Sequence, residues 1–393
     1  MVNLTTANNA LKTVYLDVLG NMLNVSTNPL FAKIKKTTDG VCGKEIKVMA
    51  PFGVNGGITA TSEVGTLPVA GNNDYLTFTT PLKNLYGRIE ISDKAVRASQ
   101  SSAGAFVNLL NDEMEGLIKS SALNLSRMLY SDGYGLLSEI KSVSSDGYTL
   151  TVDSVNSVWE GMIVDIADHT TRNLTEGATL CKIVGIDRTN KTVKLDKSVS
   201  IPYVDEGGFC LTVQGSYKNE ITGIFAMFNP NIFSLYGLKK SDYPFMNGRS
   251  YPDAGELTDM SIIEKIDFAE DTTGAKVNFI SCSSAVRRKY QESLIASNRN
   301  VQTIDIGNGV KALDFYGIPM VSDRFVENDR MYLLDTDCFT LHQMCDWEWL
   351  ADESGNVLSQ KSDYPVYTAT LVKYADLICN CPSGQSVMRG ITV

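Results

Sequence analysis

The side chains best suited to metal chemistry lie in the segment CFTLHQMC, which contains Cys338, His342 and Cys345. Cys379 and Cys381 follow in the last strand-like run of the chain. Zinc favours such ligands, but Cys-x3-His-x2-Cys is not one of its usual spacings. Since a buried cysteine commonly behaves as a small apolar residue, core packing is the favoured interpretation and no metal site is predicted.

The other patterns that could support catalysis are weak. Ser138 and Lys141 match the Ser-x-x-Lys pattern, but the companion motifs of that mechanism are missing, and chance explains the match. Neighbouring carboxylates do not imply the geometry of an acid/base pair, so solvated faces are favoured. These neighbours are Glu113 with Glu115, Glu270 with Asp271, Asp346 with Glu348, and Asp352 with Glu353.

Aromatic, basic and histidine side chains add no clear active site. Three tryptophans could stack on a ligand, yet tryptophan more often fills a core or an interface; they are Trp159, Trp347 and Trp349. The basic run Arg287–Lys289 is interpreted as a solvated face or an intersubunit charge contact. Only His169 and His342 are present, which leaves little room for multi-histidine metal sites. We therefore predict no catalytic residue, cofactor site or metal ligand.

Composition excludes several classes of protein. Lysine plus arginine total 35 and aspartate plus glutamate total 45, so the formal charge is −10, which is unfavourable for binding nucleic acid by counterion release. The 393 residues suggest two or three domains, and a hydrophobic fraction of 43% is ample for real cores. No apolar run is long enough to span a membrane, and the first residues do not resemble a signal peptide. The eight scattered cysteines are expected to be reduced thiols.

The N-terminal part contains elements that one chain cannot bury. A helical stripe is expected on an N-terminal arm, formed by Leu11, Val14, Tyr15, Val18, Leu19 and Met22. Strands are predicted at 45–50 and 75–80, joined by a long glycine- and proline-rich connection. A two-stranded arm is marginal by itself, so it is expected to lie on a neighbouring subunit.

A long helix and a run of short strands follow. After a strand at 86–92, apolar residues of period 3.6 predict a helix from Ala103 to Tyr130, with Ser101 or Ser102 as its cap. From Lys141 to Tyr217, alternating segments separated by turn clusters predict a separate all-β domain, either a barrel or a sandwich.

The remaining chain is expected to be mixed α/β. Helices are predicted at 259–268 and 285–296, and a long alternating strand is predicted at 364–379. Shorter strands are expected at 277–281, 301–306, 312–316 and 331–334. Elements that cannot be satisfied within one chain indicate an obligate assembly.

This order of elements resembles the major capsid protein of tailed bacteriophages, which has the Hong Kong 97-type fold. The returning strand YGRIEIS, the segments ITGIFAMF and DFYGIPMVSDRF, and the ending TLVKYADLICNCPSGQSVMRGI are similar to family segments. The resemblance implies an α+β fold with an N-terminal arm, an E-loop, a P domain with a long spine helix, an A domain and an inserted small all-β domain.

The resemblance also implies a division of the chain. The expected parts are the arm (1–40), the E-loop and return strand (41–92), the spine-helix region (93–140), the inserted β-domain (141–217), the A domain (218–355) and the closing P-domain strand (356–393).

The implied function is that of a structural virion protein and not of an enzyme. Copies would form hexamers and pentamers of an icosahedral shell that encloses double-stranded DNA without reading it. A separate scaffolding protein, the portal and a decoration protein are the implied partners, with no membrane; assembly would occur in the host cytoplasm and the product would be the virion. Two alternatives stay open: an encapsulin-type nanocompartment shell, and an enzyme with an all-β accessory domain.

Overall fold

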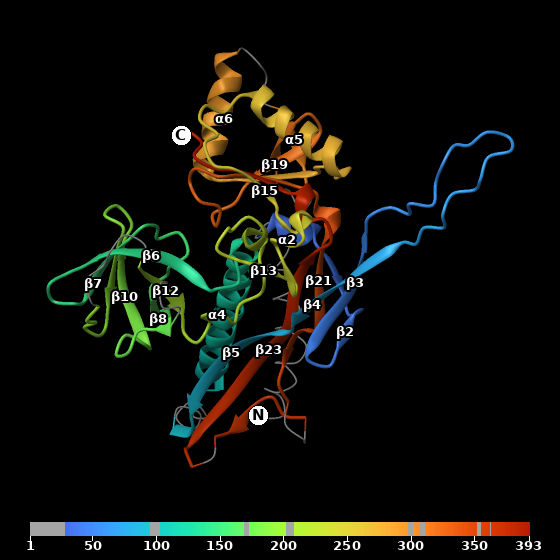
Figure 1. The fold of residues 1–393 in the computed structure, drawn as a ribbon. Coiled ribbons are helices and arrows are strands. Elements are labelled where there is room, and N and C mark those ends of the chain that lie inside the picture. Colours follow the sequence, from blue (N-terminus) through green and yellow to red (C-terminus); the bar gives the residue numbers. More distant parts are fainter. Residues whose placement is uncertain are drawn as a thin grey trace.

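The computed structural model describes residues 28–94, 103–168, 173–201, 208–297, 302–306, 311–351, 355–361 and 363–393. Figure 1 shows an elongated body built on one long helix and one long sheet, with an α/β lobe at one end. A small all-β unit lies on one flank of the body, and a long hairpin extends from the opposite flank. The predicted N-terminal stripe, the cap at Ser101 or Ser102, and His169 lie outside the described residues.

The central helix, α4 (Ala103–Tyr130), has the predicted bounds. Its buried apolar residues recur at helical spacing, which creates one face for the core: Met114, Ile118, Ala122, Leu125 and Leu129. That face packs on strand β5 (Lys83–Ser92), where an added Cβ on Gly87 would stand 2.9 Å from Leu117 Cδ1. The glycine lets helix and strand approach closely, and a larger residue here would require the Leu117 side chain to shift.

The sheet of the body has two long strands at its centre. β23 (Val366–Cys379) pairs antiparallel with β5 along one edge and with β21 (Phe339–Trp349) along the other. The short strands β1 (Lys35–Thr37) and β22 (Ser359–Gln360) complete it. The prediction of a strand ending at Cys379 is confirmed, whereas β21 was not predicted. Its alternation is obscured because the adjacent polar residues His342 and Gln343, which point to opposite faces of the sheet, are both buried.

The hairpin is a three-stranded ribbon made of β2 (Val41–Cys42), β3 (Glu45–Phe52) and β4 (Asp74–Pro81). β3 and β4 pair in register from Glu45↔Pro81 to Phe52↔Asp74. Both strands were predicted, each slightly shorter than observed. The connection, residues 53–73, contains no helix or strand.

The all-β unit is a barrel. Its strands pair in the order β10-β11-β7-β6-β12-β8, and a further pairing of β10 with β8 closes the sheet, with β9 added beside β8. Closure decides between the two predicted architectures. The strands are β6 (Leu136–Val143), β7 (Thr149–Val152), β8 (Ile163–Asp168), β9 (Asn173–Leu174), β10 (Cys181–Asp187), β11 (Thr192–Leu195) and β12 (Phe209–Val213).

The lobe is a mixed sheet covered by two helices, α5 (Asp259–Thr273) and α6 (Ser284–Ala296). Both helices were predicted, and side-chain caps at Thr258 and Ser283 fix their first residues. The sheet consists of β15 (Arg249–Tyr251), β24 (Ser386–Met388), β20 (Met331–Leu334), β16 (Phe279–Cys282), β19 (Ile318–Ser322), β18 (Lys311–Phe315) and β17 (Thr303–Asp305), in that order.

The described chain also contains the helix α2 (Pro29–Lys33) and the hairpin of β13 (Ser234–Leu235) with β14 (Leu238–Lys239). Four short 3-10 helices lie at Ile224–Met227, Pro244–Met246, Thr336–Cys338 and Pro382–Gly384. Buried apolar residues form three large clusters, one in the body, one in the lobe and one inside the barrel. No helix of the described residues is long and apolar enough to cross a membrane.

Candidate functional site

The side chains of the cysteine-rich segment make contacts within the fold. His342 lies on β21, and its Nδ1 stands 2.8 Å from the carbonyl oxygen of Asp39. Cys379 is buried at the end of β23. The thiols of Cys338 and Cys381 share a hydrogen bond. This bond raises the pKa of Cys338 and lowers the pKa of Cys381 to about 6. Among the residues that the structure describes, no three His, Cys, Asp or Glu side chains are placed to hold a metal ion.

Ser138 and Lys141 have different partners. Ser138 is buried and its Oγ accepts a hydrogen bond from the backbone N–H of Ser154, at 2.9 Å. Lys141 Nζ is exposed and lies 3.2 Å from Glu139 Oε2. A nucleophile needs its base within hydrogen-bond reach, and the partners found for these two side chains are Ser154 and Glu139.

The remaining candidates are structural or solvated. Trp347 and Trp349 lie in the core of the body, while Trp159 contacts Phe325 edge-to-face at a centroid distance of 6.2 Å. Among the described carboxylate neighbours, Glu113, Glu270, Asp271, Asp346 and Glu348 are exposed, whereas Asp352 and Glu353 lie outside the described residues. In the basic run, Arg288 is exposed at the start of α6.

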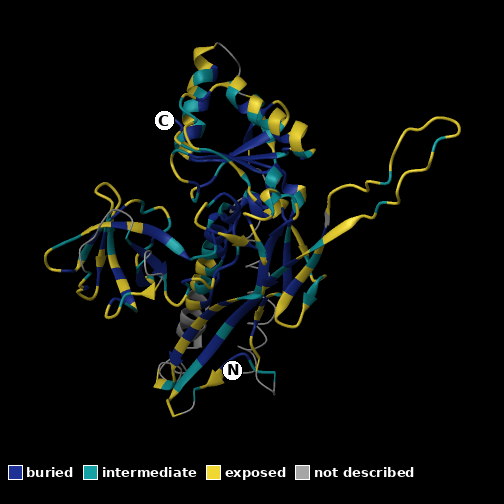
Figure 2. Ribbon diagram, in the orientation of Figure 1, coloured by how far each residue is buried: buried dark blue, intermediate teal, exposed yellow. Residues whose placement is uncertain are grey.

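The feature that stands out is the connection of the hairpin. It projects into solvent over its whole length (Figure 2). Its large apolar side chains are almost fully exposed: Val54 91%, Ile58 85%, Val64 97%, Leu67 86% and Val69 90%. We call residues 53–73 the hairpin loop. An apolar surface of this kind is typical of an interaction site.

The base of the hairpin is held firmly to the body. Phe52 packs against Phe245 and Tyr243, with centroid distances of 5.3 and 6.0 Å. On the other strand, the Thr79 N–H donates to the carbonyl of Tyr236 at 2.9 Å, and the ring of Phe78 is fully buried. The hairpin therefore leaves the body in a defined direction, and only its outer part lacks support.

A buried carboxylate joins the hairpin to the closing strand. Asp376 of β23 accepts hydrogen bonds from the Thr80 hydroxyl at 2.6 Å and from the Thr222 N–H at 2.6 Å. Burial raises the pKa of Asp376 above its ordinary value, although these hydrogen bonds act in the opposite direction. We call this the Asp376 junction.

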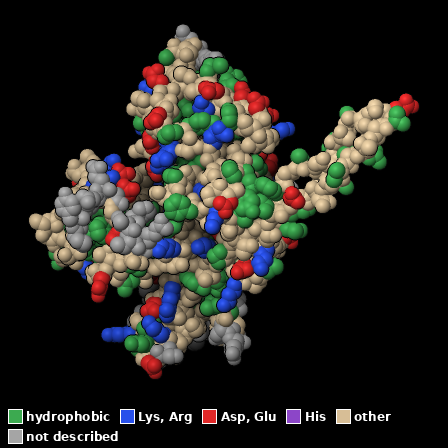
Figure 3. Space-filling view, viewed as in Figure 1, with side chains coloured by type: hydrophobic (Ala, Val, Ile, Leu, Met, Phe, Trp, Pro, Cys, Tyr) green, Lys and Arg blue, Asp and Glu red, His purple; other side chains and the backbone are tan. Residues whose placement is uncertain are grey.

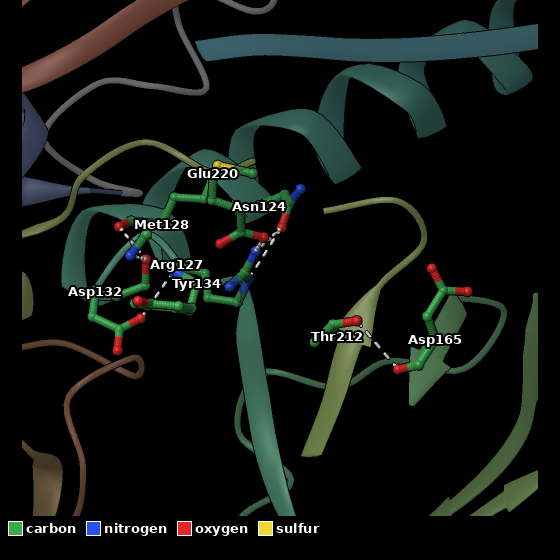
Figure 4. A network of polar contacts seen from close by, with 10 residues as sticks. Asn124, Arg127, Met128, Asp132, Tyr134, Asp165, Thr212 and Glu220 are labelled. Carbon is green, nitrogen blue, oxygen red and sulfur yellow. Dashed lines mark hydrogen bonds and ion pairs between the residues drawn. The ribbon is translucent and has the colours of Figure 1, made fainter. Parts of the chain in front are cut away.

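A buried ion pair holds the foot of the barrel. Arg127, on the last turn of α4, pairs with Glu220 and also donates to Asn124 Oδ1 at 2.8 and 3.1 Å (Figure 4). The two charged side chains are only 3% and 1% exposed. Three residues after Glu220, Gly223 packs tightly against the end of α4, since an added Cβ there would stand 2.8 Å from the carbonyl oxygen of Leu129. The chain that returns from the barrel is thus locked against the end of α4.

The sequence analysis did not identify the buried polar contacts at Asp376 and at Arg127 with Glu220, nor a third one at Lys373. Lys373, fully buried on β23, donates to Gln343 at 2.7 Å and to Asp346 at 2.6 Å. Burial lowers the pKa of Lys373, and the Asp346 carboxylate offsets part of that effect. The available signal was a charged residue inside an apolar run, as at Lys373 and Asp376 in VYTATLVKYADLIC.

No protein-family model and no curated protein matches the sequence. Solved structures do match, and one is the cyanophage A-1(L) capsid asymmetric unit, with 12% identity, a TM-score of 0.52, and coverage of 92% of this chain and 91% of that one. The chain has the Hong Kong 97-type fold. That fold was predicted from the order of the elements.

Two further similar structures have lower scores. The capsid of the empty GTA particle has 10% identity and a TM-score of 0.48, and covers 92% of this chain and 89% of that one. The SrpI encapsulin of Synechococcus elongatus has 9% identity and a TM-score of 0.40, and covers 91% and 85%. Within the Hong Kong 97-type fold of this chain, the hairpin loop is the candidate functional site, because it is the longest exposed apolar segment that the structure describes.

Proposed function

We propose that the chain is a structural virion protein, the major capsid protein of a tailed bacteriophage. Copies of it assemble as hexamers and pentamers into an icosahedral shell that encloses double-stranded DNA. The observation that carries this proposal is the hairpin loop, an apolar segment that stays exposed in a single chain of capsid-type fold. The role is structural, not enzymatic.

The apolar side chains of the hairpin loop need a covering surface that one subunit does not provide. The five large apolar side chains of the loop touch none of the three large cores of the subunit. A soluble protein rarely leaves such a surface permanently in water, because burying apolar area is favourable by about 25 cal/mol per Å². An assembly of identical subunits supplies the missing cover at every copy.

The parts of the fold then take roles in the shell. The hairpin with its loop is the E-loop within 41–92, and α4 is the spine helix within 93–140. The barrel is the inserted domain expected at 141–217, and its strands run from Leu136 to Val213. The lobe belongs to the A domain expected at 218–355, although its strand β24 comes from 356–393. β23 belongs to the closing P-domain strand within 356–393, and β21, within 218–355, pairs with it in the sheet of the body. The barrel has its own core, which favours an inserted unit.

Partners and location follow from the same role. The shell is the main partner of each subunit, with a separate scaffolding protein, the portal and a decoration protein acting during assembly or afterwards. Packaged DNA is contained and not read, which suits a chain with a formal charge of −10. The subunit assembles in the host cytoplasm and ends in the virion.

The test is to express the chain with and without a candidate scaffolding protein and to measure particle size by light scattering and electron microscopy. Closed shells of uniform diameter are expected. A stable monomer under every condition would contradict the proposal. The matched control is a variant with aspartate at Val64 and Leu67, which keeps the subunit intact and removes the apolar loop surface.

A further inference from the structure

The barrel carries a second exposed apolar surface. On β10, Lys182 and Val184 alternate with the buried Cys181 and Ile183 and therefore face outward, and Leu180, just before the strand, is 51% exposed. We call Leu180, Lys182 and Val184, together with Ile163 of β8, which pairs with Lys182, the barrel patch. Its three apolar side chains are 42–58% exposed.

The barrel patch and the hairpin loop lie on opposite flanks of the subunit. Figure 1 shows the barrel on one side of the body and the hairpin extending away from the other. One copy therefore cannot bring its own loop to its own barrel. In a head-to-tail ring, however, the flank that carries the hairpin faces the neighbour's opposite flank.

The two surfaces are complementary in charge. The hairpin loop contains a single charged residue, Glu63, beside the most exposed apolar side chain, Val64. Figure 3 shows acidic atoms at the tip of the hairpin and hydrophobic side chains along it. The barrel patch has the cation Lys182, and a second cation lies at its edge, where Lys197 Nζ donates to the Leu180 carbonyl oxygen at 3.0 Å. One carboxylate is also close, since Asp196 Oδ1 accepts a hydrogen bond from the Lys182 backbone N–H at 2.7 Å. An extended chain from Phe52 to Glu63 spans at most roughly 40 Å, enough to cross onto a neighbour.

We propose that the hairpin loop of one copy docks on the barrel patch of a second copy. The apolar side chains of the loop cover those of the patch, and Glu63 lies beside Lys182. The inserted barrel is then a receiving surface for the neighbour's hairpin. This inference rests on the proposed shell function and names the partner surface of the same loop.

The first test is a charge exchange. The variants Glu63→Lys and Lys182→Glu each place like charges together, and each should raise the concentration needed for assembly by roughly tenfold. The combined variant restores the pair with reversed polarity and should return within roughly threefold of the wild type. Lys191→Glu, the same charge change at a turn of the barrel, is the matched control and should leave assembly unchanged.

The second test is covalent. The double variant Val64→Cys with Val184→Cys, treated with a mild thiol oxidant, should give covalent oligomers on a non-reducing gel. The two single variants and the wild type, which contains exposed Cys42, should not give them. Normal particles with no cross-link, and a Lys182→Glu variant that assembles like the wild type, would show that something else covers the barrel patch and overturn this inference while leaving the shell function standing. A chain that stays monomeric in every condition would overturn both.

Discussion

The barrel and the hairpin are both made of antiparallel strands, and both project from the body, yet they differ in where their apolar side chains lie. The barrel closes on itself through the pairing of β10 with β8 and encloses a core that includes Ile140, Leu150 and Leu211. The hairpin remains open and leaves Val64 97% exposed. Closure removes strand edges and buries apolar area within one chain, whereas an open hairpin depends on a partner.

The two regions are also attached differently. The barrel is held at its foot by the ion pair of Arg127 with Glu220, and the hairpin by the Asp376 junction. Both attachments are buried and polar, so each requires satisfied partners. The exposed surface of a region, and not its secondary structure, therefore decides whether the region serves the subunit or the assembly.

The largest effect is expected from removing the hairpin loop. Replacing residues 53–73 by Asn-Gly leaves Phe52 and Asp74 paired through a tight turn. Assembly should be abolished, while the free energy of unfolding of the monomer should stay within about 2 kcal/mol of the wild type because loop-closure entropy changes slowly with length. Light scattering and chemical denaturation measure the two quantities.

A point-variant pair controls for that excision. Aspartate at Val64 and Leu67 should also abolish assembly, whereas aspartate at the exposed, polar Thr59 and Thr66 should not. If both pairs assemble alike, the apolar side chains of the loop are not the contact surface.

The next effect concerns the foot of the barrel. Removing one partner of a buried ion pair leaves an uncompensated charge, so Glu220→Gln should lower the free energy of unfolding by about 3–5 kcal/mol. Combining Arg127→Met with Glu220→Leu should recover much of that loss. Glu160→Gln, which breaks the exposed pair with Arg188, should cause no measurable change. Equal effects at the two sites would contradict the role of the buried pair.

The barrel core should behave as a local unit. Leu211 is fully buried, so Leu211→Ala should cost about 2–5 kcal/mol. Hydrogen exchange should accelerate in β6, β8 and β12 and stay unchanged in β21 and β23, because the barrel has its own core. Val184→Ala, on the outer face, should alter the stability of the monomer by less than about 0.5 kcal/mol. Faster exchange throughout the body would show that barrel and body unfold together.

Much of this fold could be predicted because its local patterns are strong. The helix α4 has a clear 3.6 period and was placed at its observed bounds, and the strands β7, β8, β10, β11 and β12 coincide with alternating segments between turn clusters. The strand β21 was missed because the polar residues His342 and Gln343 are buried on its two faces, where they pair with distant groups.

The buried polar contacts could not be predicted for a related reason. Arg127 and Glu220 are 93 residues apart, and Thr80 and Asp376 are 296 residues apart. A single sequence shows that a charged residue interrupts an apolar run, but it does not show which distant side chain satisfies it. The hairpin loop was predictable, since its glycine and proline content marks it locally.

A smaller effect is expected at the hairpin's attachment. Thr80→Val keeps the shape of the side chain and removes the hydroxyl that donates to Asp376, which should cost about 1–3 kcal/mol. Thr77→Val, at an exposed position of the same strand, is the matched control and should have little effect. Chemical denaturation measures both; the Asp376 junction would lose its assigned role if the two variants were equally stable.

The smallest effect is a change in pH dependence at the same junction. Burial raises the pKa of Asp376 in the folded chain above its ordinary value of 3.8. Between the ordinary and the raised pKa, the folded chain binds more protons than the unfolded chain, so this group makes stability fall as pH rises through that window. Asp376→Asn removes the titration, so the variant should gain stability relative to the wild type as the pH rises from the ordinary pKa through the raised one. Asp242→Asn, at an exposed position, should show no such trend. If the difference in the free energy of unfolding between wild type and Asp376→Asn does not change with pH, the Asp376 junction is not a proton-sensitive attachment of the hairpin. The attachments of the hairpin and the barrel would then be equivalent in this respect.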